Sequence, residues 1–237
     1  MDSVKNTKND PIIDALFRAG VHYGYARSRR HPSVKPYIFT SKNKTDIFDL
    51  EKTKDLLEKS KELLKNLGRE GKQVLFVGSK HESLPFVRKA AEELGMPFVA
   101  GRWVGGTLTN FSVIRTRIDK LLLLQEQREA GELAAKYTKK EQLMIDREIA
   151  RLENLFAGLV SLKSLPTAIV AIDPGKEYIV VSEARKTGIT VVALAGSDCD
   201  LSLVNYPVVG NDASSQSIAL FLETMASSYQ EGQKRSA

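Results

Sequence analysis

The sequence is poor in the side chains that most often carry catalysis or bind metal ions. Its 237 residues include one cysteine, three histidines and one tryptophan. Cys199 has no partner for an internal disulfide and no second cysteine for a zinc site, which fits a reducing compartment. His22, His31 and His81 stand neither in a metal-ligand repeat such as His-x-x-x-His nor beside a nucleophile motif. We therefore predict no catalytic residue, no metal site and no cofactor.

Long apolar runs are also missing. No run approaches the roughly 20 residues that a membrane-spanning helix needs, and residues 1–6 lack the apolar core of a signal peptide. We therefore expect a cytoplasmic protein without membrane contact. Hydrophobic residues make up 42% of the chain, enough for a substantial core. The net charge of +6 and a pI near 9.3 suit a polyanionic partner without identifying it.

Acidic residues are absent from the stretch 15–45, while basic residues accumulate there. The basic residues are Arg18, Arg27, Arg29, Arg30, Lys35, Lys42 and Lys44. Histidine and tyrosine side chains are interleaved with them. Guanidinium groups beside aromatic rings suit a phosphate backbone and unstacked bases, which RNA presents together. A merely solvated, charged loop is the alternative, and the length of the acid-free stretch favours nucleic-acid contact.

Short apolar runs rich in β-branched residues alternate with helical patterns in two parts of the chain. Residues 73–78 precede a helix over about 82–94 and a second run at 98–100. The order recurs with runs at 168–174 and 190–194 around a further helix. Uninterrupted apolar strands separated by helices indicate a parallel sheet that is covered on both faces. The sequence therefore predicts an α/β fold.

Three further elements flank this pattern. Residues 37–39 and 46–48 surround a Lys/Asn turn and predict a β-hairpin. Residues 50–67 form a strongly amphipathic helical pattern, and Asp212 is placed to cap a final helix that contains several large apolar residues.

A helical insertion separates the two α/β parts. Residues 101–111, GRWVGGTLTNF, carry a Gly-Gly turn and the only tryptophan, and they lead into a long charged segment. Apolar residues recur at three- and four-residue steps in 114–125 and 145–156, which predicts two helices. Thr138 and Glu141 have the spacing of a capping box for the second helix. We therefore predict an antiparallel hairpin whose charged outer faces are mostly solvated.

These patterns divide the chain. We assign residues 11–110 and 157–228 to a single α/β domain and residues 111–156 to the inserted hairpin. The polar ends, residues 1–10 and 229–237, are predicted to be disordered tails.

One motif favours a different class of function. Gly78-Ser79-Lys80 follows a strand and opens a helix, which is where a doubly wound sheet binds phosphate. The motif lacks the Walker spacing and the Gly-x-Gly-x-x-Gly fingerprint, so an ordinary strand-to-helix turn is favoured. Asp173 after the later strand is more typical of a helix cap than of a catalytic base. The alternative function is a cytosolic phosphosugar- or nucleotide-binding enzyme at Gly78 to Lys80, for which only His81 and Glu82 offer a nearby base.

Motifs along nearly the whole chain, from about Ile12 to Ala226, carry a resemblance to a known family. They are Gly20-Val21-His22-Tyr23-Gly24, Lys35-Pro36-Tyr37-Ile38-Phe39, Ile47-Phe48-Asp49-Leu50-Glu51-Lys52-Thr53, Leu75-Phe76-Val77-Gly78-Ser79-Lys80, Gly101 to Phe111, Leu165-Pro166, Ile172-Asp173-Pro174, Tyr206-Pro207 and Gly210-Asn211-Asp212. Together they are highly specific. The sequence resembles the bacterial small-subunit ribosomal protein S-two family.

The resemblance implies a Rossmann-like (flavodoxin-like) parallel sheet with helices on both faces and an inserted antiparallel coiled-coil hairpin. It implies a structural constituent of the small ribosomal subunit, not an enzyme, that binds small-subunit rRNA near the junction of head and body. Neighbouring small-subunit ribosomal proteins are the implied partners, including the large protein that gathers mRNA. No small-molecule substrate and no membrane are implied, and the implied location is cytoplasmic and ribosome-bound.

The resemblance also places RNA-binding residues. Arg29 lies in the family's basic loop, Lys35 in its Lys-Pro-Tyr-Ile-Phe motif, and Arg102 and Trp103 in the Arg-Trp turn. This chain departs from the family at Tyr25, Arg30 and His31, which usually hold histidine, an aromatic residue and asparagine. In this family the turn at Gly78 to Lys80 is explained as inherited fold or as an rRNA phosphate contact. Together with the acid-free stretch, the predicted RNA-binding residues are Arg27, Arg29, Arg30, Lys35, Lys42, Lys44, Arg102, Trp103 and Arg115.

Overall fold

The structure is a computed structural model that describes residues 10–234. The tail predicted at residues 1–10 lies outside these residues, except for Asp10. The side chain of Asp10 accepts a hydrogen bond from the backbone N–H of Ile12 and caps helix α1 (Pro11–Arg18). A capped first turn begins the fold at this point.

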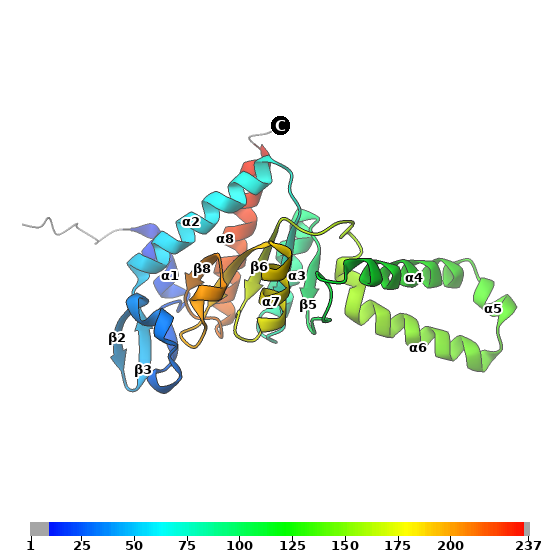
Figure 1. Cartoon of the computed structure of the whole chain (residues 1–237), viewed down its shortest axis with the longest axis horizontal. Helices are drawn as coiled ribbons and strands as arrows, with labels where there is room; N and C mark the ends of the chain where they lie inside the picture. Colours follow the sequence, from blue (N-terminus) through cyan, green and yellow to red (C-terminus); the bar gives the residue numbers. More distant parts are fainter. Residues whose placement is uncertain (1–9, 235–237) are drawn as a thin grey trace, which may run out of the picture.

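A five-stranded parallel sheet forms the centre of the molecule (Figure 1). Its order is β5-β4-β6-β7-β8. The strands are β4 (Val74–Gly78), β5 (Phe98–Ala100), β6 (Ala168–Ile172), β7 (Thr190–Ala195) and β8 (Tyr206–Val209). Every residue of β4 and β6 is buried, as expected for apolar strands covered on both faces. The predicted α/β fold is therefore confirmed.

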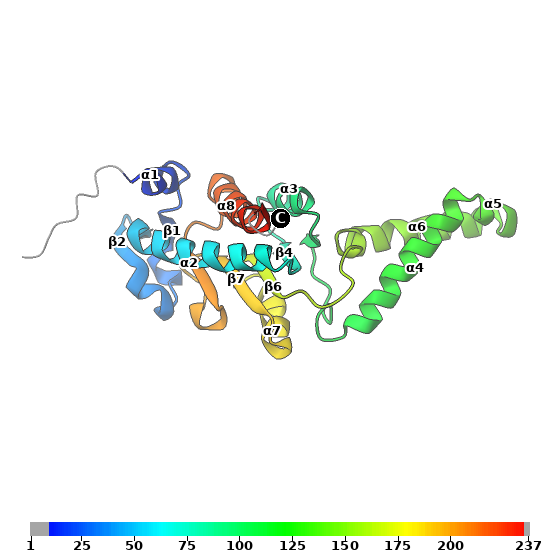
Figure 2. The ribbon, with the colours of Figure 1, turned by 90° about the horizontal axis from the view of Figure 1, so that it is seen from above.

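Alternate residues of the strands divide the core between the two faces of the sheet. Val74 and Phe76 pack in one cluster with residues of α2 (Leu50–Arg69), α3 (Leu84–Leu94) and α8 (Ser215–Lys234). Leu75 and Val77 point the other way and join a second cluster with α7 (Tyr178–Thr187) and the base of the helical insertion. This period of two is the ordinary geometry of a strand. Figure 2 shows α7 on the opposite side of the sheet from α3 and α8.

A small antiparallel sheet with the order β1-β3-β2 precedes the central sheet. Its strands are β1 (Tyr23–Ala26), β2 (Ile38–Lys42) and β3 (Thr45–Phe48), with the short 3-10 helices η1 (Arg27–Arg29) and η2 (Pro32–Tyr37) between β1 and β2. The predicted hairpin corresponds to β2 and β3, paired from Ile38↔Phe48 to Lys42↔Thr45. Strand β1 was not predicted from the sequence.

The insertion projects from one end of the molecule, away from the small sheet (Figures 1 and 2). It consists of α4 (Phe111–Glu129), the short α5 (Glu132–Lys136) and α6 (Lys139–Phe156), and η3 (Ala157–Leu159) follows it. The predicted capping box is present, because Glu141 accepts hydrogen bonds from the backbone and side chain of Thr138. The two long helices are thus confirmed. They run at an angle to each other in both views, and coiled-coil geometry stays a prediction.

The prediction of a disordered tail from residue 229 is wrong for residues 229–234, because α8 continues to Lys234. Tyr229 is 1% exposed, and its hydroxyl donates a hydrogen bond to the carbonyl of Lys72 at 2.9 Å. Gly232 faces α2 so closely that a Cβ there would lie 2.1 Å from the carbonyl oxygen of Lys65. This close helix contact stabilises the last turns of α8. The remainder of the predicted tail, 235–237, lies outside the described residues.

The turn between β5 and α4 is fixed to the body by a single carboxylate from α7. Glu183 is 6% exposed. It accepts hydrogen bonds from the indole N–H of Trp103 at 3.2 Å and from the backbone N–H groups of Gly106 at 2.7 Å and Leu108 at 2.9 Å. The backbone N–H and the hydroxyl of Thr109 also donate to it. One side chain therefore satisfies five donors of the turn that precedes the insertion.

The ionisation of Glu183 follows from these contacts. Burial alone raises the pKa of a carboxyl group, but the donors from Leu108, Gly106, Trp103 and Thr109 outweigh burial and lower the pKa of Glu183 below its usual value. A carboxyl with a lowered pKa in the folded state stabilises that state above its unfolded pKa. The contribution is lost as the pH falls through the folded pKa.

We predict that Glu183→Gln lowers the free energy of unfolding at pH 7 by about 1–3 kcal/mol, because the amide leaves buried donors without an acceptor. The variant should also lose part of the decline in stability that the parent shows in acid. Urea unfolding from pH 7 down to pH 3 measures both effects. Glu129→Gln, at an exposed position of α4, is the control and should change stability by no more than about 0.5 kcal/mol. Equal effects of the two substitutions would contradict the assignment.

Candidate nucleic-acid interface

The small antiparallel sheet and the adjoining 3-10 helices present a group of exposed cations. We call this group the basic surface; it consists of Arg27, Arg29, Lys35, Lys42 and Lys44, all exposed. Within the described residues, none of them lies in an ion pair. Their charges therefore face solvent without an internal counter-ion.

Local backbone geometry places two lysines of this surface: Lys42, the last residue of β2, and Lys44, which directly precedes β3. Asn43 and Lys44 have φ angles of 51° and 64°, in the left-handed region that two-residue hairpin turns with this twist require. Asn tolerates this conformation well. The turn lets β2 and β3 pair up to Lys42↔Thr45, so Lys42 and Lys44 stand at the tip of the hairpin.

Aromatic side chains accompany the cations. The guanidinium of Arg29 lies 5.6 Å from the centre of the Tyr25 ring, a cation–π distance. Phe39 on β2 is 74% exposed and Tyr23 on β1 is 53% exposed. Exposed rings and unpaired guanidinium groups on one small sheet and its adjoining 3-10 helices are the combination that single-stranded RNA recognition uses.

Arg30 does not belong to the basic surface. Its Nε lies 3.1 Å from Oδ2 of Asp46, a β3 carboxylate that is fully buried. The hydroxyl of Ser41 donates to the other oxygen of this carboxylate at 2.6 Å. The acid-free stretch placed Arg30 among the predicted RNA-binding residues, but a carboxylate from outside that stretch neutralises it. The arginine and the carboxylate are distant in sequence but adjacent in the antiparallel sheet.

Other side chains of the protein already bind the polar groups of the turn at Gly78 to Lys80. The Lys80 ammonium lies 2.7 Å from Asp173 and 2.9 Å from Asp212, and it donates to the Tyr25 hydroxyl at 3.0 Å. The backbone N–H of Ser79 donates to Glu177 at 2.8 Å. A bound phosphate would have to displace these internal partners. The structure thus gives no support to a phosphate contact at this turn, whether from an rRNA or from a small substrate.

The electrostatics of this cluster follow from burial and close charges. Burial opposes the charged form of Lys80, but Asp212 and Asp173 outweigh it and raise the pKa of the ammonium. Burial raises the pKa of Asp212 to about 6, although Lys80 acts against this shift. Burial also raises the pKa of Tyr25 to about 12. The cluster is a buried ion pair with hydrogen-bonded neighbours. Removing one partner of such a pair strongly destabilises the fold, because it leaves a buried charge without compensation.

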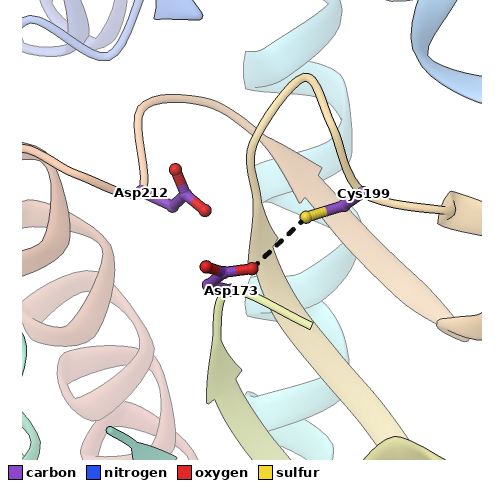
Figure 3. A group of neighbouring side chains, drawn as sticks. All are labelled: Asp173, Cys199 and Asp212. Atoms are coloured by element: carbon purple, nitrogen blue, oxygen red, sulfur yellow. Dashed lines mark hydrogen bonds between the residues drawn. The ribbon is translucent and has the colours of Figure 1, made fainter. Parts of the chain in front are cut away.

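Among the described residues, this cluster also contains the one group of side chains whose spacing could hold a metal ion. Ligand atoms of Asp173, Cys199 and Asp212 lie within 4.8 Å of one another, and the thiol of Cys199 is 3.5 Å from Asp173 (Figure 3). Burial and the nearby acids raise the pKa of the thiol, which disfavours the thiolate that binds metal ions. The Lys80 ammonium already contacts both carboxylates. The predicted absence of a metal ion stays a prediction.

The remaining predicted RNA-binding residues lie at the base of the insertion. Arg102 is exposed, and it has no ion pair within the described part of the chain. Trp103 is only 8% exposed and is held by Glu183, so its ring packs in the core and does not form an open stacking platform. Arg115 donates to the carbonyls of Val160 at 3.2 Å and Leu162 at 3.3 Å. Its guanidinium therefore joins α4 to the segment that follows η3.

The predicted residues thus fall into two groups at opposite ends of the central sheet (Figure 1). The basic surface lies at the end with β2 and β3, and Arg102 lies beside β5. Sequence reasoning missed Glu183 and Asp46 as the residues that organise the two ends. Glu183 did leave a signal, because it lies next to Val180, Val181 and Ala184 on the apolar face of an amphipathic helix, where a carboxylate needs partners.

Within the described residues, no helix combines the length and the apolar character that a membrane crossing requires.

A family model described as Ribosomal protein S2 matches residues 16–232. The small ribosomal subunit protein uS2 of Sulfurimonas denitrificans is 42% identical over 217 residues, which are 92% of this chain and 83% of the relative. Proteins of the same name from Nitratiruptor sp. and Coprothermobacter proteolyticus are each 39% identical and cover 92% and 94% of this chain and 82% of each relative.

The matches span nearly all of the fold, including both sheets and the insertion. They exclude the alternative of a phosphosugar- or nucleotide-binding enzyme, because the family is made of structural ribosomal proteins and not of enzymes. The chain belongs to the ribosomal protein S2 family.

Proposed function

We propose that the chain is a structural component of the small ribosomal subunit that binds small-subunit rRNA in the cytoplasm and supports translation. The basic surface carries this proposal. Arg27, Arg29, Lys35, Lys42 and Lys44 are exposed without ion pairs, although acids neutralise many other cations of the chain. Unpaired cations on one face repel one another, and a polyanion that contacts them relieves this repulsion.

RNA fits this surface better than a protein partner of opposite charge. Arginine binds phosphate through a planar fork and also stacks on bases, and Arg29 already lies against the Tyr25 ring. Exposed Phe39 and Tyr23 offer further π-faces on the same small sheet. Single-stranded or looped rRNA presents phosphates and unstacked bases together, and it can therefore use both kinds of side chain.

The insertion supports a second contact with the subunit. We propose that residues 111–156 form an excursion from one α/β domain built from 11–110 and 157–228, and that the excursion adds RNA or protein contacts. Its projection beyond the sheet supports this division (Figure 2). A position near the head-body junction and a role in docking the mRNA-gathering protein follow from the family resemblance described above.

We predict that Arg27→Gln with Arg29→Gln weakens binding to a small-subunit rRNA fragment and lowers the magnitude of the salt slope. The log–log slope should shrink by up to about 1 for each phosphate that the variant no longer neutralises. Filter binding or fluorescence anisotropy at several salt concentrations measures this. Lys163→Gln with Lys186→Gln removes the same charge at exposed positions elsewhere and serves as the control. Equal losses of affinity in both variants would mean that net charge, and not the basic surface, governs binding.

Arg30→Gln should act on stability instead. The substitution leaves the buried Asp46 carboxylate without its cation, and we expect the free energy of unfolding to fall by about 3 kcal/mol. Adding Asp46→Asn should restore part of the stability, because the unpaired charge is removed. Chemical denaturation of the two variants and the parent tests this. A stability change below about 0.5 kcal/mol for Arg30→Gln would contradict the structural assignment.

The outer part of the insertion should be dispensable for folding. Ile118 and Leu152 belong to the same buried cluster as Leu75 and Val77, so the base must be kept. Replacing residues 122–148 with a short Gly/Ser linker should leave a cooperative thermal transition, because loop closure costs little. Incorporation into small subunits, measured by sedimentation, should fall. A broad, non-cooperative transition would show that the outer helices are part of the folding unit.

A further inference from the structure

A groove lies where the insertion joins the central sheet, on the side of β5. It consists of two adjoining hollows of about 600 and 510 Å³, which share Arg102, Asn154 and Leu155 as lining residues. One hollow extends along the turn that holds Trp103, and the other extends toward α3. Volumes of this size accommodate small ligands or single residues of a polymer.

Arginines from separate elements line this groove. Arg88 comes from α3, Arg102 from the turn after β5 and Arg151 from α6. Arg102 has no ion pair within residues 10–234. Arg151 is 73% exposed and forms a surface ion pair with Glu148 at 3.5 Å, which water screens and a phosphate can replace. Positive charge from three directions therefore converges on one groove.

The acids that line the groove offset only part of this charge. Glu153 already accepts a hydrogen bond from Gln125 at 2.6 Å and lies 4.0 Å from Arg128, so its charge is engaged on the insertion side. Glu92, the other acidic lining residue, is exposed at the far end of the groove on α3. The end that contains Trp103 has no acidic lining residue among those described.

The floor of the groove is apolar. Val104 and Leu155 line it and are partly buried, and the buried Trp103 lines it too. The exposed amide of Asn154 adds both a donor and an acceptor. An apolar floor suits a nucleobase, the guanidinium rim suits its phosphates, and the amide can read a base edge.

We propose that this groove binds an unstacked nucleotide of single-stranded or looped RNA. The proposal deepens the proposed function and rests on RNA being the partner. It adds Arg88, Arg151 and Asn154 to the RNA contacts, at the end of the sheet opposite the basic surface. An acidic peptide could satisfy the arginines, but it would make little use of the apolar floor.

Glu183 holds one wall of the groove in place in the absence of a ligand. It fixes the backbone of the turn at Gly106 and Leu108 and holds the indole of Trp103. The wall of the groove is therefore rigid, and binding orders little additional backbone. A preformed site binds with a smaller entropic cost than a loop that must fold on contact.

The single tryptophan makes the groove directly observable. Trp103 is the only tryptophan of the chain, so its fluorescence reports this site and no other. We expect titration of the full chain with an octauridylate to change the Trp103 emission in a saturable way. Arg102→Gln with Arg151→Gln should weaken this binding at least about tenfold, because charge-assisted hydrogen bonds to phosphate are removed. Arg102→Lys should weaken it to an intermediate degree, since an ammonium does not reproduce a planar fork.

Matched controls separate this site from the basic surface. Arg147→Gln removes an exposed charge from α6, the helix of Arg151, but outside the groove. It should leave the Trp103 response to octauridylate unchanged. Arg27→Gln with Arg29→Gln should also leave it unchanged while weakening binding of the rRNA fragment. Unfolding curves confirm that each variant is folded.

Two results would overturn the proposal. The first is the absence of a saturable Trp103 response to octauridylate while the rRNA fragment still binds through the basic surface, an outcome that leaves the proposed function intact. The second is a response to octaglutamate as strong as that to octauridylate, which would assign the groove to acidic peptides. Failure of the parent protein to bind rRNA would instead count against the proposed function itself.

Discussion

The Glu183 carboxylate is the interaction on which the arrangement of the insertion depends. It stands on α7, which is packed against the central sheet, and it collects the donors of a turn that would otherwise be buried without acceptors. A buried carboxylate is costly alone, and buried amides are costly alone. Each satisfies the other here. The insertion therefore leaves the body from a fixed point, and Arg102 and the floor of the groove take their positions from the same contact.

The central sheet could be predicted because its signal is strong and local. Runs such as 73–78 and 168–174 are apolar at nearly every position, and such runs form strands buried on both faces. Strand β8 was missed because it is short and contains Pro207, which removes a backbone donor and is tolerated only at an edge such as this one. Strand β1 was missed because it exists only through its pairing with β3, and its own residues carry no clear alternation.

The candidate site was predictable in composition but not in geometry. The acid-free stretch identified the basic surface, yet nothing in the local sequence distinguishes Arg30 from Arg29. Arg30 meets Asp46 through strand pairing, whereas Arg29 lies on the Tyr25 ring and faces solvent. Lys80 likewise has the sequence position of a phosphate ligand. Its ammonium is nevertheless bound by Asp173 and Asp212, which come from the ends of other strands. Contacts between residues distant in sequence decide which cation remains unpaired. The number of charges in a stretch of sequence does not show this.

This separation of cations is what the proposed function requires, because the chain must be stable and also able to bind RNA. A guanidinium that faces a buried carboxylate is part of the fold, because its removal strands a charge in a medium of low dielectric. A guanidinium on the surface costs the fold little, since water solvates it and no buried group depends on it. Its full donor capacity remains for a phosphate. Arg27 and Arg29 beside β1 and Arg102 beside β5 are of the second kind, while Arg30 and Lys80 are of the first. A sheet buried on both faces lies between the two exposed groups, so the RNA contacts proposed at its opposite ends would fix the orientation of the whole protein and not only its position.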